Sequence, residues 1–156
     1  MNTPSNLIEL SEANIGDLEG LVALRIEAMR ASLERVGRFD PVRARERFAA
    51  GFSPEHTRHI VVAHAKVGFV VVKPQSGHLL LDHLYIQPGM QGQGIGAAVL
   101  ARVFVEADQA AVSLRVGALR ESASNRFYLR HGFVLVAETV FDNYYVRRCK
   151  IAPQSV

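Results

Sequence analysis

The feature that most constrains the fold is an apolar run followed by glycines and then by a helical pattern. Leu79 to Ile86 is apolar, partly β-branched and partly aromatic, and is long enough for a mostly buried strand. The Pro88-Gly89 pair ends this strand as a turn. From Ile95 onward, apolar side chains return every three or four residues, which indicates an amphipathic helix. The stretch therefore predicts a strand, a turn, a glycine-rich loop and a helix, in that order.

The glycines of the loop, Gly92, Gly94 and Gly96, allow its backbone to approach a ligand closely. Because the loop opens a helix, it presents free N–H groups and the positive end of the helix dipole, which favours a phosphate or pyrophosphate. Two other phosphate-binding patterns fit less well. There is no Gly-Lys-Ser/Thr, and no acidic residue ends the next strand, near Val116, to hold a ribose. On the loop alone, an ordinary turn capping a helix fits equally well.

Composition is typical of one globular domain over residues 1–156, with 152–156 as a loose tail. The 156 residues are 49% hydrophobic and 21% charged, which excludes a disordered chain. The net charge of +3 comes without a dense Lys/Arg run, so nucleic acid is not an expected partner. The longest apolar region, Ile60 to Val72, is too short and too interrupted to span a membrane. The single cysteine, Cys149, and an N-terminus without a signal-peptide pattern predict a cytoplasmic protein.

The rest of the chain predicts a sheet around the central strand. Consecutive strands without an intervening helix indicate antiparallel pairing, and the strand-helix-strand at the glycine loop indicates one parallel pair. We therefore expect an α/β fold with a mixed, mostly antiparallel, twisted sheet of about seven strands and about four helices. The expected strands are 7–10, 59–64, 67–72, 79–86, 112–116, 133–136 and 144–151, with a turn at 142–143, and the helices begin near Asn14, Pro41, Ile95 and the cap Ser122.

Two short motifs lie on either side of the predicted strand near Val116. The first is Gln91-x-x-Gly94-x-Gly96, and the second is Tyr128 with Gly132-Phe133, which together read Tyr-x-x-x-Gly-Phe. In this order they resemble the acyl-CoA loop and the second signature of the GNAT superfamily of N-acetyltransferases. The resemblance covers residues 7–150, and it implies that the sheet predicted above is the acyl-CoA N-acyltransferase fold.

The resemblance also implies an activity and a coenzyme site. It implies transfer of an acetyl group from acetyl-CoA, the cosubstrate, to a primary amine of a small molecule or peptide. In the family the pantetheine arm pairs with the central strand like an added strand. A homodimer is among the assemblies we consider. The expected coenzyme contacts are Leu84, Tyr85, Ile86, Gln91, Gly92, Gln93, Gly94, Ile95, Gly96, Ala97, Asn125, Arg126 and Tyr128.

One position departs from the family pattern. Many members have an asparagine seven residues before the tyrosine, and Glu121 stands there in this chain. A version with Ser-x-x-Asn-Arg-Phe-Tyr also occurs in the family, and Ser122 to Tyr128 fits it. Coenzyme contacts from this helix are therefore expected from Asn125 and Arg126.

Acetyl transfer needs a neutral amine, donors for the charge on the thioester oxygen and a proton for the leaving thiolate. A backbone N–H of Leu84 to Ile86 is expected to polarise the thioester, and Tyr128 to protonate the thiolate. The alternative for Tyr128 is a core tyrosine with a satisfied hydroxyl. Asp82 and His83 are candidate general bases, and as neighbours on a strand they point to opposite faces unless a bulge intervenes. Either could instead be structural, and Glu27, Glu138 and Tyr145 are further candidates.

The acceptor and two competing functions stay open. A non-catalytic acyl-CoA-binding or sensor module is the first alternative, and a nucleotide-binding oxidoreductase is the second. The histidines show no metal-ligand spacing, so no metal is expected. Several arginines on the acceptor side favour an amine that also carries a carboxylate or phosphate. The residues expected on that side are Glu27, Met29, Arg30, Arg38, Phe39, Arg43, Glu138, Tyr144 and Tyr145.

Overall fold

The computed structural model describes residues 4–150, in which seven strands and four α-helices follow one another in the predicted order. The strands form one sheet in the order β1-β2-β3-β4-β5-β7-β6. The mixed α/β sheet predicted from the sequence is thereby confirmed. The elements are β1 (Ile8–Glu12), α1 (Leu18–Arg35), α2 (Pro41–Ala50), β2 (Thr57–Val62), β3 (Ala65–Gln75), β4 (His78–Ile86), α3 (Ile95–Gln109), β5 (Ser113–Leu119), α4 (Ser124–Arg130), β6 (Val134–Glu138) and β7 (Asp142–Arg147).

The strand pairing follows the predicted pattern. β4 and β5 are parallel, joined by the crossover through α3. The pairs β1–β2, β2–β3, β5–β7 and β6–β7 are antiparallel. The last hairpin is inserted so that β7, rather than β6, lies next to β5, which leaves β6 at the edge of the sheet.

The chain gathers into two compact units, which are described separately. The first comprises the chain up to Val71 together with His83–Val99. The second comprises Val72–Asp82 together with the chain from Leu100 onward. A single domain over residues 1–156 stays a prediction, and the predicted tail at 152–156 lies outside the described residues. None of the helices in residues 4–150 is long and apolar enough to cross a membrane.

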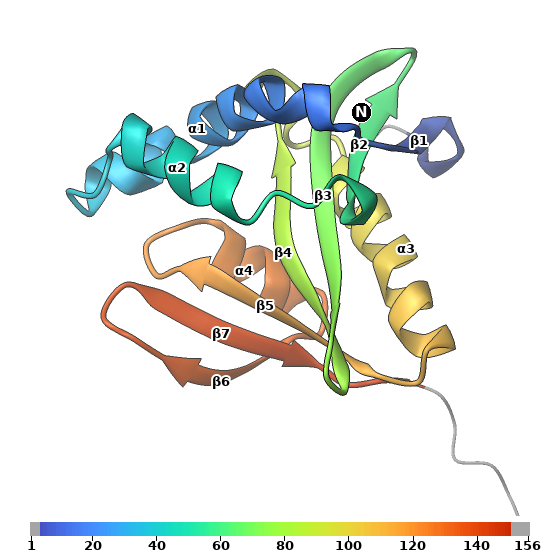
Figure 1. Ribbon diagram of the computed structural model, residues 1–156. Coiled ribbons are helices and arrows are strands. Elements are labelled where there is room, and N and C mark those ends of the chain that lie inside the picture. Colours follow the sequence, from blue (N-terminus) through green and yellow to red (C-terminus); the bar gives the residue numbers. More distant parts are fainter. Residues whose placement is uncertain (1–3, 151–156) are drawn as a thin grey trace, which may run out of the picture. The chain divides into compact units, whose positions relative to one another are not determined.

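In the first unit, α1 and α2 lie side by side (Figure 1). Local sequence explains where α2 begins, because the Asp40 carboxylate accepts the Arg43 N–H at 3.1 Å and Pro41 occupies the first turn. Apolar side chains of both helices pack with those of β3, which gives this unit its core. The core cluster is Ala13, Leu21, Val22, Phe48, Phe69 and Val71.

In the second unit, an ion pair links α3 to the end of β7. Arg147 is only 5% exposed, and its guanidinium donates to both carboxylate oxygens of Asp108, at 2.8 and 3.1 Å. It also lies 4.1 Å from the centre of the Phe104 ring. The Arg147 side chain and the Lys150 N–H lower the pKa of Asp108 to about 2. This ion pair therefore holds β7, the last strand along the chain, to α3.

Two local predictions in the second unit were wrong. Ser122 does not cap α4, because the N-cap is Ala123 without a side-chain bond and the Ser122 hydroxyl donates to the Leu119 carbonyl at 2.8 Å. Asp142 and Asn143 do not form a turn but begin β7, where they pair with β5. Ladder hydrogen bonds override the turn preference of an Asp-Asn pair at that point.

Candidate functional site

The glycine loop of the first unit leads directly into α3. Gly92 and Gly94 both have φ of 78°, a left-handed conformation that side chains with a Cβ rarely adopt. The Gly94 carbonyl accepts the Ala98 N–H at 3.1 Å, so the N–H groups of Ile95, Gly96 and Ala97 precede the intrahelical ladder. The first turn of α3 contains no acidic side chain. These donors and the helix dipole suit an anion, as the diphosphate of CoA requires.

Gln91, predicted to contact the coenzyme, makes hydrogen bonds within the loop. Its side-chain amide donates to the Ile86 carbonyl at 2.9 Å, and its N–H reaches the Pro88 carbonyl at 3.4 Å. Both groups are used inside the loop, so Gln91 ties the loop to the end of β4. The N–H groups that precede the helical ladder are those of Ile95, Gly96 and Ala97.

The end of β4 is held closely against β3 in the first unit. A Cβ on Gly68 would lie 2.2 Å from the Tyr85 carbonyl oxygen, so only glycine fits there. The Gln87 N–H donates to the Val67 carbonyl at 2.8 Å. The parallel ladder of β4 with β5 is formed from His78 to Leu81, and β4 itself continues to Ile86. The segment from Leu84 to Ile86, predicted to bind pantetheine, is therefore anchored on its β3 side.

His83 lies in an aromatic cluster of the first unit. Its ring centre is 5.0 Å from that of Phe48, 5.6 Å from Tyr85 and 6.1 Å from Phe69. The Nδ1 atom is buried. The Tyr85 hydroxyl donates to the Met29 sulfur at 3.0 Å, which connects the cluster to α1. Packing of this kind is the structural alternative that the sequence left open for His83.

Asp82 has a separate environment in the second unit. Its carboxylate lies 3.1 Å from the Lys73 ammonium on β3. The side chain of Asp82 is 33% exposed, so water can reach the carboxylate. A role as general base acting through water stays a prediction for Asp82, as it does for His83.

Tyr128 lies on α4 in the second unit and is 5% exposed. Its ring contacts Phe133 with centres 5.2 Å apart and Tyr145 with centres 6.2 Å apart. Gly132, with φ of 93°, ends the helix and lets Phe133 turn back onto Tyr128. The Tyr-x-x-x-Gly-Phe pattern thus has a local physical reason. The aromatic cluster fixes the Tyr128 ring in one orientation.

The Asn125 side chain is committed to bonds within the second unit. Its amide group donates to the carbonyls of Leu119 and Ser122 at 2.8 and 2.9 Å. Its carbonyl oxygen accepts from the Asn143 amide at 2.9 Å and from the Tyr145 hydroxyl at 2.7 Å. The predicted coenzyme contact by this side chain is therefore not favoured, because its hydrogen-bonding groups already have partners. Arg126, also predicted to contact the coenzyme, is exposed on the first turn of α4.

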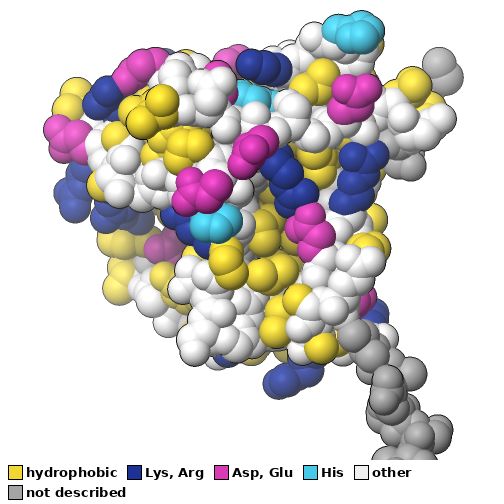
Figure 2. Space-filling view, turned by 45° about the vertical axis from the view of Figure 1, so that its right-hand side comes forward, with side chains coloured by type: hydrophobic (Ala, Val, Ile, Leu, Met, Phe, Trp, Pro, Cys, Tyr) yellow, Lys and Arg dark blue, Asp and Glu magenta, His cyan; other side chains and the backbone are white. Residues whose placement is uncertain are grey.

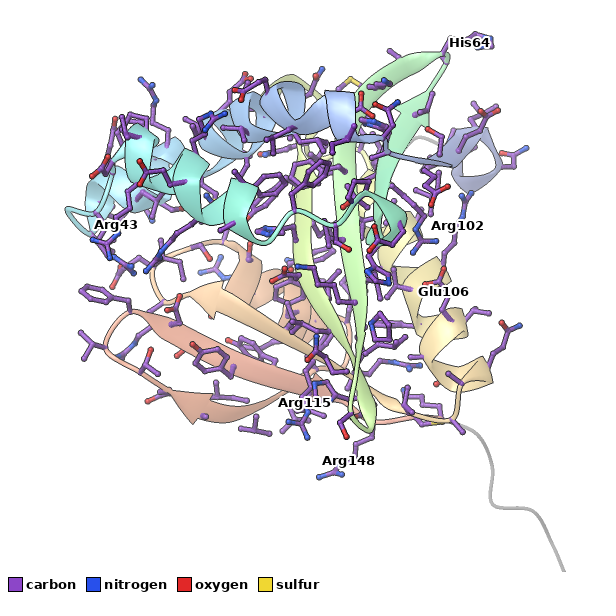
Figure 3. The ribbon with its side chains drawn as sticks, viewed as in Figure 1. Arg43, His64, Arg102, Glu106, Arg115 and Arg148 are labelled. Atoms are coloured by element: carbon purple, nitrogen blue, oxygen red, sulfur yellow. The ribbon has the colours of Figure 1, made fainter. Side chains whose placement is uncertain are left out.

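The residues predicted on the acceptor side differ in exposure. Glu27, Arg43 and Glu138 are exposed, and Arg43 is labelled near the start of α2 in Figure 3. The Arg30 guanidinium lies 4.7 Å from the Phe39 ring. On the face drawn in Figure 2, Lys and Arg side chains lie among Asp and Glu rather than forming one continuous basic surface. Among residues 4–150, no group of three or more His, Cys, Asp or Glu side chains could hold a metal ion.

These observations define an α/β acyltransferase-like fold with a glycine-rich loop at the start of a helix. The family model described as the acetyltransferase (GNAT) domain matches residues 56–135, which include both motifs. The chain therefore belongs to the GNAT acetyltransferase family. No curated protein matches it in sequence.

Solved structures give the same fold at low sequence identity. PaiA N-acetyltransferase from Thermoplasma acidophilum, in complex with coenzyme A, aligns with a TM-score of 0.74 and 18% identity over 90% of this chain and 98% of its own. An acetyltransferase from Thermus thermophilus gives 0.71 and 18% over 94% and 99%. The ribosomal-protein-S18-alanine N-acetyltransferase from Escherichia coli gives 0.68 and 18% over 96% and 98%.

The structure adds Arg25 to the candidate site, a residue that was not among those predicted from the sequence. Arg25 is half-buried on α1, and its guanidinium lies 6.0 Å from the Tyr85 ring. A signal was present in the sequence, because Arg25 shares a helix face with the apolar residues three and four positions away, Leu21, Val22, Ala28 and Met29. A charged side chain in such a stripe usually has a partner or a function.

Proposed function

We propose that this protein is an N-acetyltransferase that transfers an acetyl group from acetyl-CoA to a primary amine of a small molecule or peptide. The observation that carries the proposal is the glycine loop, which presents backbone donors at the start of α3 directly after β4. Membership of the GNAT acetyltransferase family supports it. The single cysteine supports a cytoplasmic site of action.

The coenzyme would be held by backbone groups. The N–H groups of residues 92–97 would bind the diphosphate, and no acidic side chain in the first turn of α3 opposes it. The pantetheine arm would pair with the backbone of Leu84 to Ile86 as an added strand. Anchoring of this segment by Gly68 and Gln87 against β3 supports a preformed strand edge. CoA complexed to the PaiA enzyme, which has the same fold, is consistent with this assignment.

The reaction would proceed by direct attack. The amine nitrogen forms a bond to the thioester carbon, the carbon–sulfur bond breaks, and the thiolate leaves with the electron pair. A backbone N–H of Leu84 to Ile86 would stabilise the charge on the carbonyl oxygen. Tyr128 would give its proton to the thiolate, and Asp82 or His83 would accept the proton that the amine loses. The fixed orientation of the Tyr128 ring supports this assignment.

A panel of amines with acetyl-CoA tests the proposal, with release of free thiol as the readout and mass spectrometry of the product. Acetylation of at least one primary amine at rates well above hydrolysis is the expected result. The competing non-catalytic module predicts CoA binding without thiol release for every amine. Asp82→Asn and His83→Gln, compared across pH, then separate the two candidate bases, since only loss of the true base flattens the rise of kcat/KM with pH.

A further inference from the structure

Arg25 lies in the middle of α1, with its guanidinium toward the Tyr85 ring on β4. The guanidinium is 6.0 Å from the Tyr85 ring centre, and the Tyr85 hydroxyl bonds to Met29, one helical turn beyond Arg25. The Nε atom of Arg25 is buried and has no hydrogen-bond acceptor among residues 4–150. A buried donor without an acceptor is uncommon and costs stability unless a bound molecule supplies one.

Other arginines of the chain show how this one differs. Arg147, buried in the second unit, donates to both oxygens of Asp108. Arg45, at the surface of the first unit, pairs with Glu19 on α1. Arg25 is half-buried and its Nε is fully so, yet within the described part of the chain this atom meets no acceptor. The Arg25 guanidinium is therefore positioned to pair with an anion, because the described residues supply no acceptor to its Nε.

We propose that Arg25 binds the carboxylate of the amine acceptor, so that the acceptor is a small amino-acid-like molecule. The inference rests on the proposed function. Tyr85, the contact of Arg25, belongs to the segment from Leu84 to Ile86 that would hold the thioester. An amine attacking there would place a carboxylate a few bonds away within reach of Arg25. Polyamines and aminoglycosides carry no such group and would leave the guanidinium unpaired.

Buried aromatic side chains lie next to the Tyr85 ring that Arg25 contacts. Phe48, Phe69 and Tyr85 surround the imidazole with ring centres 5.0 to 6.1 Å away. These side chains give the neighbourhood of Arg25 a low polarity, which strengthens a guanidinium–carboxylate pair. A carboxylate is favoured over a phosphate because one guanidinium balances its single negative charge, whereas a phosphate monoester carries nearly two at neutral pH.

The test uses free amino acids and the matching amino acid amides, which differ only at the carboxyl group. Acetylation rates would be measured by thiol release, and equilibrium binding to the CoA-loaded protein by calorimetry. The parent protein is expected to prefer acids over amides by roughly 10- to 100-fold in kcat/KM and in Kd. Arg25→Gln should remove the preference while leaving the Kd for CoA unchanged, and Arg25→Lys should retain only part of it. Arg148→Gln, the same change at an exposed arginine after β7, should keep the full preference.

The outcomes separate this inference from the proposed function. Two results would overturn the role of Arg25 alone. The first is acetylation of amines without a preference for acids over amides. The second is a folded Arg25→Gln protein in which kcat/KM falls equally for acids and amides. A weaker Kd for CoA in Arg25→Gln would reassign Arg25 to the coenzyme and overturn it too. Absence of transfer to any amine, with Arg25-dependent binding of the acids intact, would overturn the proposed function and leave the carboxylate site standing.

Discussion

The glycine loop before α3 and the first turn of α4, which precedes the second family motif, use their polar groups in opposite ways. The loop leaves the N–H groups of Ile95, Gly96 and Ala97 ahead of the helical ladder, where a ligand can bind them. The turn uses the Asn125 amide for bonds to Leu119, Ser122, Asn143 and Tyr145. A motif can therefore supply binding groups in one place and scaffold in another. In the turn, the scaffold holds the helix that bears Tyr128.

The largest expected effect comes from removing the Tyr128 hydroxyl, which is the proton donor that the second motif would supply. Tyr128→Phe should lower kcat by about 10²–10⁴-fold, because a positioned acid is lost. The ring contacts with Phe133 and Tyr145 remain, so the melting temperature and the Kd for CoA should change little. Steady-state kinetics and calorimetry check both. An unchanged kcat across pH, with chemistry shown to limit the rate, would reduce Tyr128 to a core residue.

In the first motif, the next substitution changes the backbone conformation of the glycine loop. Gly94→Val should weaken CoA binding by about 100-fold or more, because a β-branched residue is disfavoured at φ of 78° and its side chain would crowd the donors. Calorimetry with CoA measures the loss. Gly89→Ala is the matched control, since a Cβ there meets nothing within 4 Å and φ is not positive. Tight CoA binding by a folded Gly94→Val protein would show that the loop is not the coenzyme site.

The scaffold role of the first turn of α4 is tested at Asn125. Asn125→Ala should reduce the free energy of unfolding by about 2–3 kcal/mol, because several partly buried partners lose their bonds. Tyr145→Phe removes only one of those bonds, so its expected cost is about 1 kcal/mol. Urea denaturation measures both. The opposite pattern, unchanged stability with CoA affinity lost in Asn125→Ala, would make Asn125 a coenzyme ligand, as the sequence alone predicted.

These two regions also show how much of the candidate site can be predicted from the sequence. The glycine loop is readable because its conformation depends on local residue types, and the predicted α3 start at Ile95 is confirmed. The environment of Asn125 is not readable, since Asn143 and Tyr145 come to it through strand pairing between β5 and β7. Gln91 illustrates the same limit, because its bond to Ile86 depends on how the loop folds back. Arg25 was visible as a charge in an apolar stripe, but its contact with Tyr85 depends on the packing of α1 on β4.

A smaller effect concerns pH and the ion pair of Asp108 with Arg147. The pKa of Asp108 is lowered from 3.8 to about 2 in the folded protein, so folding favours the charged carboxylate. The stabilisation from this group is complete above the unfolded value of 3.8 and is lost as pH falls through about 2. Thermal melts of Asp108→Asn should show a lower melting temperature near neutral pH and a weaker fall in acid. Parallel pH curves for parent and variant would contradict the linkage.

The most direct test of the central claim is the response of individual backbone amides to CoA. In an ¹⁵N-resolved NMR titration, the N–H signals of residues 92–97 should shift strongly and saturate with the calorimetric Kd, because these donors bind the diphosphate. The Asn125 side-chain amide should keep its bonds and shift little. A titration that saturates with the loop signals unmoved would contradict the account, since CoA would then bind this protein without the α3 loop.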